Sequence, residues 1–319
     1  MPFYSYADNI LFSTFTMSGL LPVINEKVRQ FPDISFQLIN SLPPKQTDSD
    51  WIYHWLTPSG DISLSLANID NDFLLRFPSL ADFVIDGEGS YISAWLAPDT
   101  DEETLQHLLL DQVLPRVLAL QGRLVLHSSA VSVDGRIIAF IGDTGQGKST
   151  LAASFHIIGF QLLTDDGLVL KDEGGNIKAI PAYSGLRLLP ESVAALFKEL
   201  PQRKVMASYS YKERVSLGNN DEINPVELKA LFVLGDPNLG NETKSIRVSR
   251  LSQRDACMEL VRNSFQLDIS NHAQVKTLFA AASSVAEQLP VFSLTYPRDF
   301  SRLPDVHDAI LQQLKKPVQ

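Results

Sequence analysis

The sequence predicts an α/β protein in which a glycine-rich loop lies on a mixed sheet, preceded by a small β-rich part. Three observations predict this class: an apolar segment, RIIAFI, runs directly into the loop GDTGQGKST at residues 142–150, a helical pattern follows the loop, and hairpins surround it in place of a regular alternation of strands and helices. We therefore expect a β-rich domain at residues 1–98, a connecting helix at 99–121 and a second domain, which carries the loop, at 122–319.

Composition limits the classes of function. The 319 residues include 27 Lys and Arg against 37 Asp and Glu, a net charge of −10. Such an acidic chain is poorly suited to nucleic acid or to an anionic membrane, and it has no uninterrupted apolar run of about 18 residues. A single cysteine, Cys257, allows no intrachain disulfide and fits a reducing compartment. We expect a cytoplasmic protein that binds neither nucleic acid nor membrane; the oligomeric state stays open.

The N-terminal part reads as short strands and turns. The segments GDISLSL, NDFLLRF and SYISAWL are rich in β-forming residues and bounded by turn residues, with some helix expected near residues 19–30. The segment 97–122 then has acids and caps at its start, leucines and valines at helical spacing, and Gly122 as a stop signal. Pro115 lies inside this helix and is expected to kink it.

The second part begins with a hairpin whose turn is Asp134-Gly135, and the second strand of that hairpin leads into the glycine loop. A helix at 148–158 and a short strand at 160–164 follow, and this strand is expected to end at Asp165 and Asp166. Two strands flank the turn KDEGG at 171–175. Beyond it we expect a helix near 190–199, a polar stretch at 201–224, a strand at 230–235, a helical region at 251–288, a strand at 291–297 and a helix at about 304–315.

The glycine loop carries the most specific chemistry. Gly142, Gly147, Lys148 and Ser149 fit the pattern G-x-x-x-x-G-K-[ST], in which backbone N–H groups and a helix N-terminus surround phosphate oxygens. Lys148 is expected to reach the β- and γ-phosphates, and the Ser149 hydroxyl to bind Mg²⁺. The expected nucleotide site also includes Asp143, Thr144, Gly145, Gln146 and Thr150. A glycine-rich turn before a surface helix is the alternative, which the flanking strand and helix disfavour. The expected cofactors are ATP and Mg²⁺, although no motif separates ATP from GTP.

Two further features lie near the loop in sequence. Asp165 and Asp166 could divide the work between a metal and a proton-accepting base, because neighbouring residues of an extended chain point in opposite directions. The alternative is a turn, since Asp-Asp-Gly is good turn chemistry. His127 ends the apolar run RLVLH one strand before the loop; a lone histidine in such a segment is more often a structural hydrogen-bonding group than a catalyst.

The stretch from LHSSAVSVDGRIIAFIGDTGQGKST to FQLLTDDGLVL resembles the catalytic core of HPr kinase/phosphorylase, over roughly residues 122–170. The resemblance implies an HPr kinase and phosphoenolpyruvate carboxykinase-like fold, a P-loop kinase core on a mixed sheet. It implies that Lys148 binds phosphate, that Ser149 binds Mg²⁺ and that Asp165 and Asp166 are the base and the metal-side acid. We place Asp166 at the metal and leave open which aspartate is the base. His127 becomes a catalytic residue beside the transferred phosphate.

A second resemblance extends over most of the chain. PAYSGLRLLPES and LTYPRDFSRLP are similar to segments of the HPr-kinase-like proteins that accompany ribosomally made peptides, including lasso peptides. It implies an ATP-dependent serine kinase that acts on a precursor peptide. Arg187, or a loop with Lys212 and Arg214, would then contact phosphate or substrate; the alternatives are a surface arginine at a strand end and a solvated charged loop.

The HPr kinase pattern also has a downstream acid where this sequence reads AIPAYSGLRL, so phosphorylase activity and recognition of HPr both stay open for this chain. Two other functions stay open. One is a regulatory serine kinase that acts on a phosphocarrier protein. The other is a nucleotide-gated binding module without transfer activity, which the second acid disfavours because a passive switch does not need it.

Overall fold

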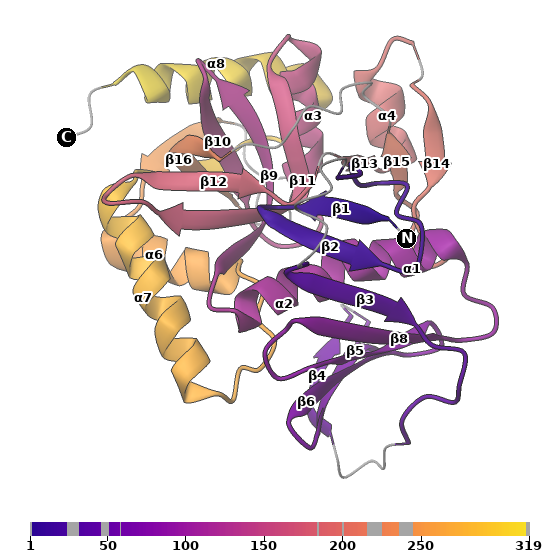
Figure 1. Ribbon diagram of the computed structural model, residues 1–319. Coiled ribbons are helices and arrows are strands. Elements are labelled where there is room, and N and C mark those ends of the chain that lie inside the picture. The colour runs from indigo at the N-terminus through magenta and orange to yellow at the C-terminus, as the bar shows by residue number, and fades with distance from the viewer. Residues whose placement is uncertain are drawn as a thin grey trace. The chain divides into compact units, whose positions relative to one another are not determined.

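A computed structural model describes residues 2–23, 32–45, 51–57, 59–183, 185–199, 201–215, 225–235 and 245–316. The chain forms two compact units. The first comprises Met1–Gln121, Val205–Tyr211 and Gln266–Asp268, and the second comprises Gly122–Lys204, Lys212–Phe265 and Ile269–Gln319. Figure 1 labels most of their elements. Among the described residues, no helix is both long and apolar enough to cross a membrane.

The first unit is built on an eight-stranded mixed sheet in the order β1-β2-β3-β8-β7-β6-β5-β4. Its strands are β1 (Phe3–Tyr6), β2 (Asn9–Ser13), β3 (Ile34–Leu38), β4 (Trp51–Leu56), β5 (Ile62–Ile69), β6 (Asp72–Phe77), β7 (Ala81–Ile85) and β8 (Tyr91–Leu96). The β-rich character predicted for this part is confirmed. Of the helix expected near residues 19–30, residues 24–30 lie outside the described residues, and 19–23 form a turn and an isolated bridge.

The helix that the sequence predicts next is present, with a change of winding inside it. It consists of α1 (Glu102–Leu108), the π-helical segment η3 (Leu109–Val113) and α2 (Leu114–Leu120). Asp101 caps its start by accepting a hydrogen bond from the Thr104 N–H. Pro115 falls in the first turn of α2, where its missing N–H is tolerated. The interruption expected at the proline therefore takes the form of a π-helical turn just before it.

The second unit has a seven-stranded mixed sheet in the order β10-β9-β11-β12-β16-β18-β17, and β10 also pairs in parallel with β16. Its strands are β9 (Leu124–Val133), β10 (Arg136–Ile141), β11 (Gln161–Asp172), β12 (Ile177–Pro181), β16 (Val226–Leu234), β17 (Arg247–Arg250) and β18 (Val291–Thr295). A separate three-stranded sheet is formed by β13 (Leu186–Leu188), β15 (Glu213–Val215) and β14 (Arg203–Val205). The protein is therefore of the predicted α/β class, because it combines mixed sheets with helices.

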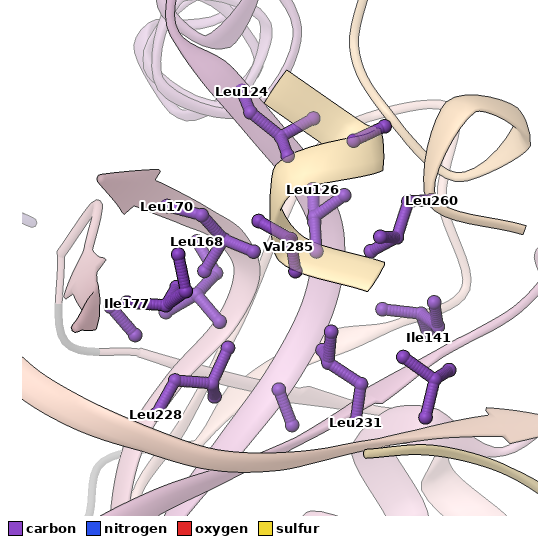
Figure 2. Packing of buried hydrophobic residues seen from close by; sticks show 14 of the residues in the cluster. Leu124, Leu126, Ile141, Leu168, Leu170, Ile177, Leu228, Leu231, Leu260 and Val285 are labelled. Carbon is purple, nitrogen blue, oxygen red and sulfur yellow. The ribbon is translucent and has the colours of Figure 1, made fainter. Parts of the chain in front are cut away.

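Helices cover both faces of the seven-stranded sheet. They are α3 (Lys148–Ile157), α6 (Gln253–Arg262), α7 (His272–Gln288) and α8 (Leu303–Lys315), with a short 3-10 helix η4 (Phe300–Arg302) before α8. Helix α4 (Pro190–Leu196) packs instead against the three-stranded sheet. Alternate residues of β9 point into two cores. Leu124 and Leu126 join the core beneath α6 and α7, whereas Val131 joins the core beneath α3 and α8. Figure 2 shows Val285 of α7 and Leu260 of α6 beside Leu126.

Two sequence-based boundaries were wrong. The strand expected to end at the aspartate pair continues as β11 from Gln161 to Asp172, so Asp165 and Asp166 lie inside a strand. Gly167 does not form a turn because it pairs with His127 of β9; the turn comes after Asp172. The helical region expected at 251–288 is two helices, α6 and α7, separated by residues 263–271.

Candidate functional site

Strand pairing places the glycine loop and the aspartate pair at neighbouring positions. Strand β9 lies between β10 and β11 and runs antiparallel to both. Ser128 of β9 pairs with Ile141, the last residue of β10, and on its other side with Asp166 of β11. The residue before Ser128 is His127, which faces Gly167, while Gly142 follows Ile141. The start of the loop, the histidine and the second aspartate therefore lie at the same level of the sheet, where β10 ends.

Two further strands end at the same level of the sheet. Strands β16 and β18 run parallel to β10, with Ile141 opposite Val233, and Val233 opposite Ser293. Three parallel strands thus end together where the glycine loop begins. The carboxyl end of parallel strands is the usual place for a ligand in an open α/β sheet.

The backbone of the loop requires glycine at its two pattern positions. Gly142 has a φ of 144° and Gly147 a φ of 85°, values that side chains with a Cβ rarely allow. A Cβ on Gly142 would also collide with Oε1 of Gln146. That oxygen is fixed because it accepts a hydrogen bond of 3.1 Å from the N–H of Asp143. The side chain of Gln146 therefore stabilises the loop by a hydrogen bond to the backbone of Asp143.

The loop ends at the N-terminus of α3, and that terminus has no side-chain cap. The N-cap residue of this ten-residue helix is Gly147, which has no side chain that could accept a hydrogen bond from the first turn. The first N–H groups of a helix have no partner within the helix and carry a partial positive charge. Residues 143–145 of the loop are exposed. This arrangement suits an anion that approaches from solvent.

Lys148 is the first residue of α3, and its side chain is buried across the loop. Its Nζ donates hydrogen bonds to the carbonyl oxygens of Gly142, at 2.7 Å, and Asp143, at 3.1 Å. Burial lowers the pKa of Lys148 to about 8, although the negative charge of Asp166 acts to raise it. Among the acids that act on this pKa, Asp166 has the largest effect, ahead of Asp165 and Asp143. Lys148 and Asp166 are thus electrostatic neighbours.

The carboxylate of Asp165 is enclosed by protein. Its Oδ1 accepts a hydrogen bond of 2.5 Å from the Ser129 hydroxyl, and its Oδ2 accepts one of 2.9 Å from the Arg187 N–H. The residue is only 3% exposed. Both oxygens of Asp165 are therefore engaged in internal structure.

Asp166 is more accessible, with a side chain 13% exposed. One carboxylate oxygen forms an ion pair with the Arg187 guanidinium, and the other lies 3.6 Å from Nδ1 of His127. The φ of Asp166 is 150°, which is unusual for a residue other than glycine and is the kind of backbone strain that collects at functional sites. The imidazole of His127 also makes an edge contact with Phe265, with ring centroids 5.8 Å apart.

Arg187 joins the two aspartates. Its guanidinium donates to the carbonyl oxygen of Asp165 at 2.6 Å and to the Asp166 carboxylate, and it lies over the ring of Tyr183. The side chain is 1% exposed, so the alternative of a surface arginine at a strand end is wrong. Asp165 contacts Arg187 through its carboxylate and its carbonyl oxygen, and Asp166 contacts Arg187 through its carboxylate. The two aspartates, which we expected to point in opposite directions, therefore share one partner.

The other two basic candidates lie on or beside the neighbouring strand β15. Arg214 pairs with Arg187 across β13 and β15, and Lys212 is close enough to Lys148 to lower the pKa of its amino group. Both residues are half-buried. The charge of Lys212 therefore acts on the lysine of the glycine loop.

Sequence reasoning missed one residue of the site, Arg298, which follows β18. Its guanidinium donates hydrogen bonds to the carbonyl oxygen of Gln146 inside the loop and to that of Gly235 after β16, the latter at 3.2 Å. The segment LTYPRDFSRLP, which contains Arg298, resembles segments of other proteins, but nothing in the sequence pairs Arg298 with a loop about 150 residues earlier.

The residues present fit a Mg²⁺ ion that comes with a nucleotide. In the described parts of the chain, no three His, Cys, Asp or Glu side chains gather so as to hold a metal by themselves. Mg²⁺ commonly takes only one or two protein oxygens and completes its shell with phosphates and water. Ser149, half-buried in the first turn of α3, would hold it directly, and Asp166 would contact the water shell of the ion. Thr150 instead bonds to the hydroxyl of Ser192, at 3.2 Å.

Comparisons with known proteins leave the family open. No protein-family model matches the sequence, and no curated protein matches it. The chain is similar to a solved structure of the Hpr(Ser) kinase/phosphatase from Coxiella burnetii, with a TM-score of 0.31 and 14% identity, over 60% of this chain and 97% of that one.

Proposed function

We propose that this protein is an ATP- and Mg²⁺-dependent kinase that transfers the γ-phosphoryl group to the serine hydroxyl of a peptide, namely a ribosomally made precursor peptide of the lasso type. One observation carries the proposal: Ile141, Ser128 and Asp166 lie in register on three neighbouring strands. This register brings an uncapped, glycine-lined helix N-terminus together with an accessible carboxylate. An anion-binding loop alone supports nucleotide binding, whereas the carboxylate beside it supports transfer.

The roles follow from burial and contacts. The N–H groups at the start of α3 and the amino group of Lys148 would bind the phosphates. Asp166, the accessible member of the pair, would accept the proton of the serine hydroxyl. As it does so, the serine oxygen would form a bond to the γ-phosphorus, and the bond between the γ-phosphorus and the oxygen of the β-phosphate would break. The products are ADP and a phosphoserine. Mg²⁺, when bound, supplies charge neutralisation on the phosphates.

The remaining residues would position these groups. Asp165 is buried between Ser129 and the Arg187 N–H, so we assign it to holding Arg187 in place. Arg187 in turn holds the Asp166 carboxylate. His127 lies on the other side of that carboxylate, at 3.6 Å, where its ring would approach the transferred phosphate. We leave Lys212 as a candidate contact for phosphate or for an acidic peptide.

The choice of a peptide acceptor is supported by the resemblance of PAYSGLRLLPES and LTYPRDFSRLP to peptide-modifying kinases. The test is a mass spectrum of candidate acceptors after incubation with ATP and Mg²⁺. The acceptors are a serine-containing precursor peptide encoded beside this protein, the phosphocarrier protein HPr, and a control without acceptor in which ADP formation is followed.

The proposal expects the mass of one phosphoryl group to be added to the peptide, and no addition with Lys148→Ala. Phosphorylation of HPr alone would replace the peptide kinase by a kinase of phosphocarrier proteins. Nucleotide binding without any phosphorylated product would favour a nucleotide-gated binding module.

A further inference from the structure

Arg298 connects three separate pieces of the second unit at the level of the sheet where β10 ends. Its Nη1 donates to the carbonyl oxygen of Gln146 and, at 3.3 Å, to the Tyr296 hydroxyl, while its Nη2 donates to the carbonyl oxygen of Gly235. The guanidinium carbon lies 4.9 Å from the centre of the Tyr296 ring. The glycine loop, the end of β16 and the end of β18 are therefore tied together by one side chain.

The bond to Gln146 fixes the direction of a peptide group that matters for phosphate binding. In a trans peptide the carbonyl and the following N–H point in opposite directions, and no cis peptide occurs among the described residues. Because the Gln146 carbonyl points at Arg298, the N–H of Gly147 points away from it. Gly147 is the last residue before α3, so this N–H directly precedes the uncapped N–H groups of the helix.

The approach of Arg298 to the loop also depends on glycine. A Cβ placed on Gly147 would lie 2.6 Å from Nη1 of Arg298 and 3.4 Å from the Tyr296 hydroxyl. Gly145 has nearly the same φ, 84° against 85°, but a Cβ there would meet no atom within 4 Å. The two glycines thus have the same backbone requirement, and only Gly147 has the arginine packed against it.

We infer that Arg298 is a positioning residue of the phosphate-binding loop, which orients the Gln146–Gly147 peptide so that the Gly147 N–H is presented to the β-phosphate of the nucleotide. The inference rests on the proposed nucleotide site and names a residue that acts on it through the loop backbone. The planar fork of arginine suits this task because it donates to two carbonyl oxygens at fixed directions. A lysine offers a single point of charge instead.

The test measures the binding of ADP, inorganic pyrophosphate and AMP by titration calorimetry to the full chain and to Arg298→Met. Loss of a hydrogen bond from a charged group is expected to weaken ADP and pyrophosphate by roughly ten- to hundredfold, while AMP, which has no β-phosphate, changes less. Arg302→Met is the matched control, because Arg302 pairs only with exposed Asp305 among its described ion pairs, and it should bind all three ligands as the unmodified chain does.

Arg298→Lys covers the case in which Arg298→Met does not fold, which circular dichroism shows directly. It keeps the charge but not the fork, and intermediate weakening of pyrophosphate is expected. Unchanged pyrophosphate affinity in a folded Arg298→Met or Arg298→Lys variant overturns the inference and leaves the proposed function standing. Equal weakening of AMP and ADP also overturns it, because that pattern indicates general loosening. If the unmodified chain binds neither ADP nor pyrophosphate, the proposed function fails together with the inference.

Discussion

The guanidinium of Arg187 forms an ion pair with the carboxylate of Asp166, inside the second unit and next to the glycine loop. The arginine is 1% exposed, and the aspartate is 13% exposed. A buried cation of this kind is costly to leave without its partner. The arrangement therefore gives Asp166 a fixed direction, and its energetic weight can be measured.

Replacing Arg187 by methionine should destabilise the protein by roughly 3–5 kcal/mol, because the Asp166 carboxylate then lacks its partner. Urea denaturation measures the loss. The double variant Arg187→Met/Asp166→Asn should lose less than Arg187→Met alone, since the uncompensated charge is gone. Arg203→Met is the control: its ion pair with Glu213 is partly exposed and should contribute less than about 1 kcal/mol. Equal losses for Arg187→Met and Arg203→Met would contradict the assignment.

The two aspartates should separate when each is changed to asparagine. Asp166→Asn should lower the rate of phosphoryl transfer by roughly 10²–10⁴-fold, the usual effect of removing a general base. It should also lower the free energy of unfolding, because buried Arg187 loses its ionic partner. Asp165→Asn should mainly lower the free energy of unfolding, because its carboxylate accepts bonds from Ser129 and Arg187. Single-turnover transfer and urea denaturation, measured on both variants, give the comparison. A reversed ranking would exchange the roles of the two residues.

Nucleotide binding should take up protons near pH 8. Burial lowers the pKa of Lys148 to about 8, so roughly half of the ligand-free molecules carry a neutral Lys148 at that pH. A bound phosphate favours the charged form and raises this pKa, so binding draws in up to about half a proton per nucleotide. Calorimetry in buffers of different ionisation enthalpy detects the uptake. It should shrink as the pH is lowered, because Lys148 is then already charged before the nucleotide binds. Equal uptake at about pH 7 and about pH 8 would assign the proton elsewhere.

The sequence was most informative where local signals agree. The glycine loop, the hairpin at Asp134-Gly135 and the helix before Gly122 could all be predicted, because strand pattern, turn residues and caps point to the same structure there. The loop pattern also required glycine at 142 and 147, where the backbone has positive φ.

Tertiary pairing decided the features that the sequence could not predict. Asp-Asp-Gly is a good turn signal, yet Gly167 pairs with His127 and the strand continues through it. A strand of this length carries Asp166 into register with Ser128 and Ile141, a relation that no single segment contains. Arg187 and Arg298 reach the site from segments far along the chain, and nothing local distinguishes either from a surface arginine.

Gly147→Ala should destabilise the protein more than Gly145→Ala. Both residues have φ near 85°, so both variants bear the cost of a left-handed residue with a Cβ, about 1–2 kcal/mol. Only alanine at 147 also collides with Nη1 of Arg298, at 2.6 Å. Urea denaturation measures the loss of unfolding free energy in each variant. The difference between the two losses should become smaller when each alanine substitution is made in the Arg298→Met variant. A difference that persists unchanged in that background would show that Arg298 is not its cause.

The central claim is that the loop and Asp166 act together in phosphoryl transfer, and it is tested most directly by transfer from γ-labelled ATP to a serine-containing precursor peptide. The unmodified chain, Lys148→Met and Asp166→Asn are compared, with ATP binding measured in parallel. The account predicts labelled phosphoserine with the unmodified chain, loss of both binding and transfer with Lys148→Met, and loss of transfer while ATP still binds with Asp166→Asn. Full transfer by Asp166→Asn would contradict it.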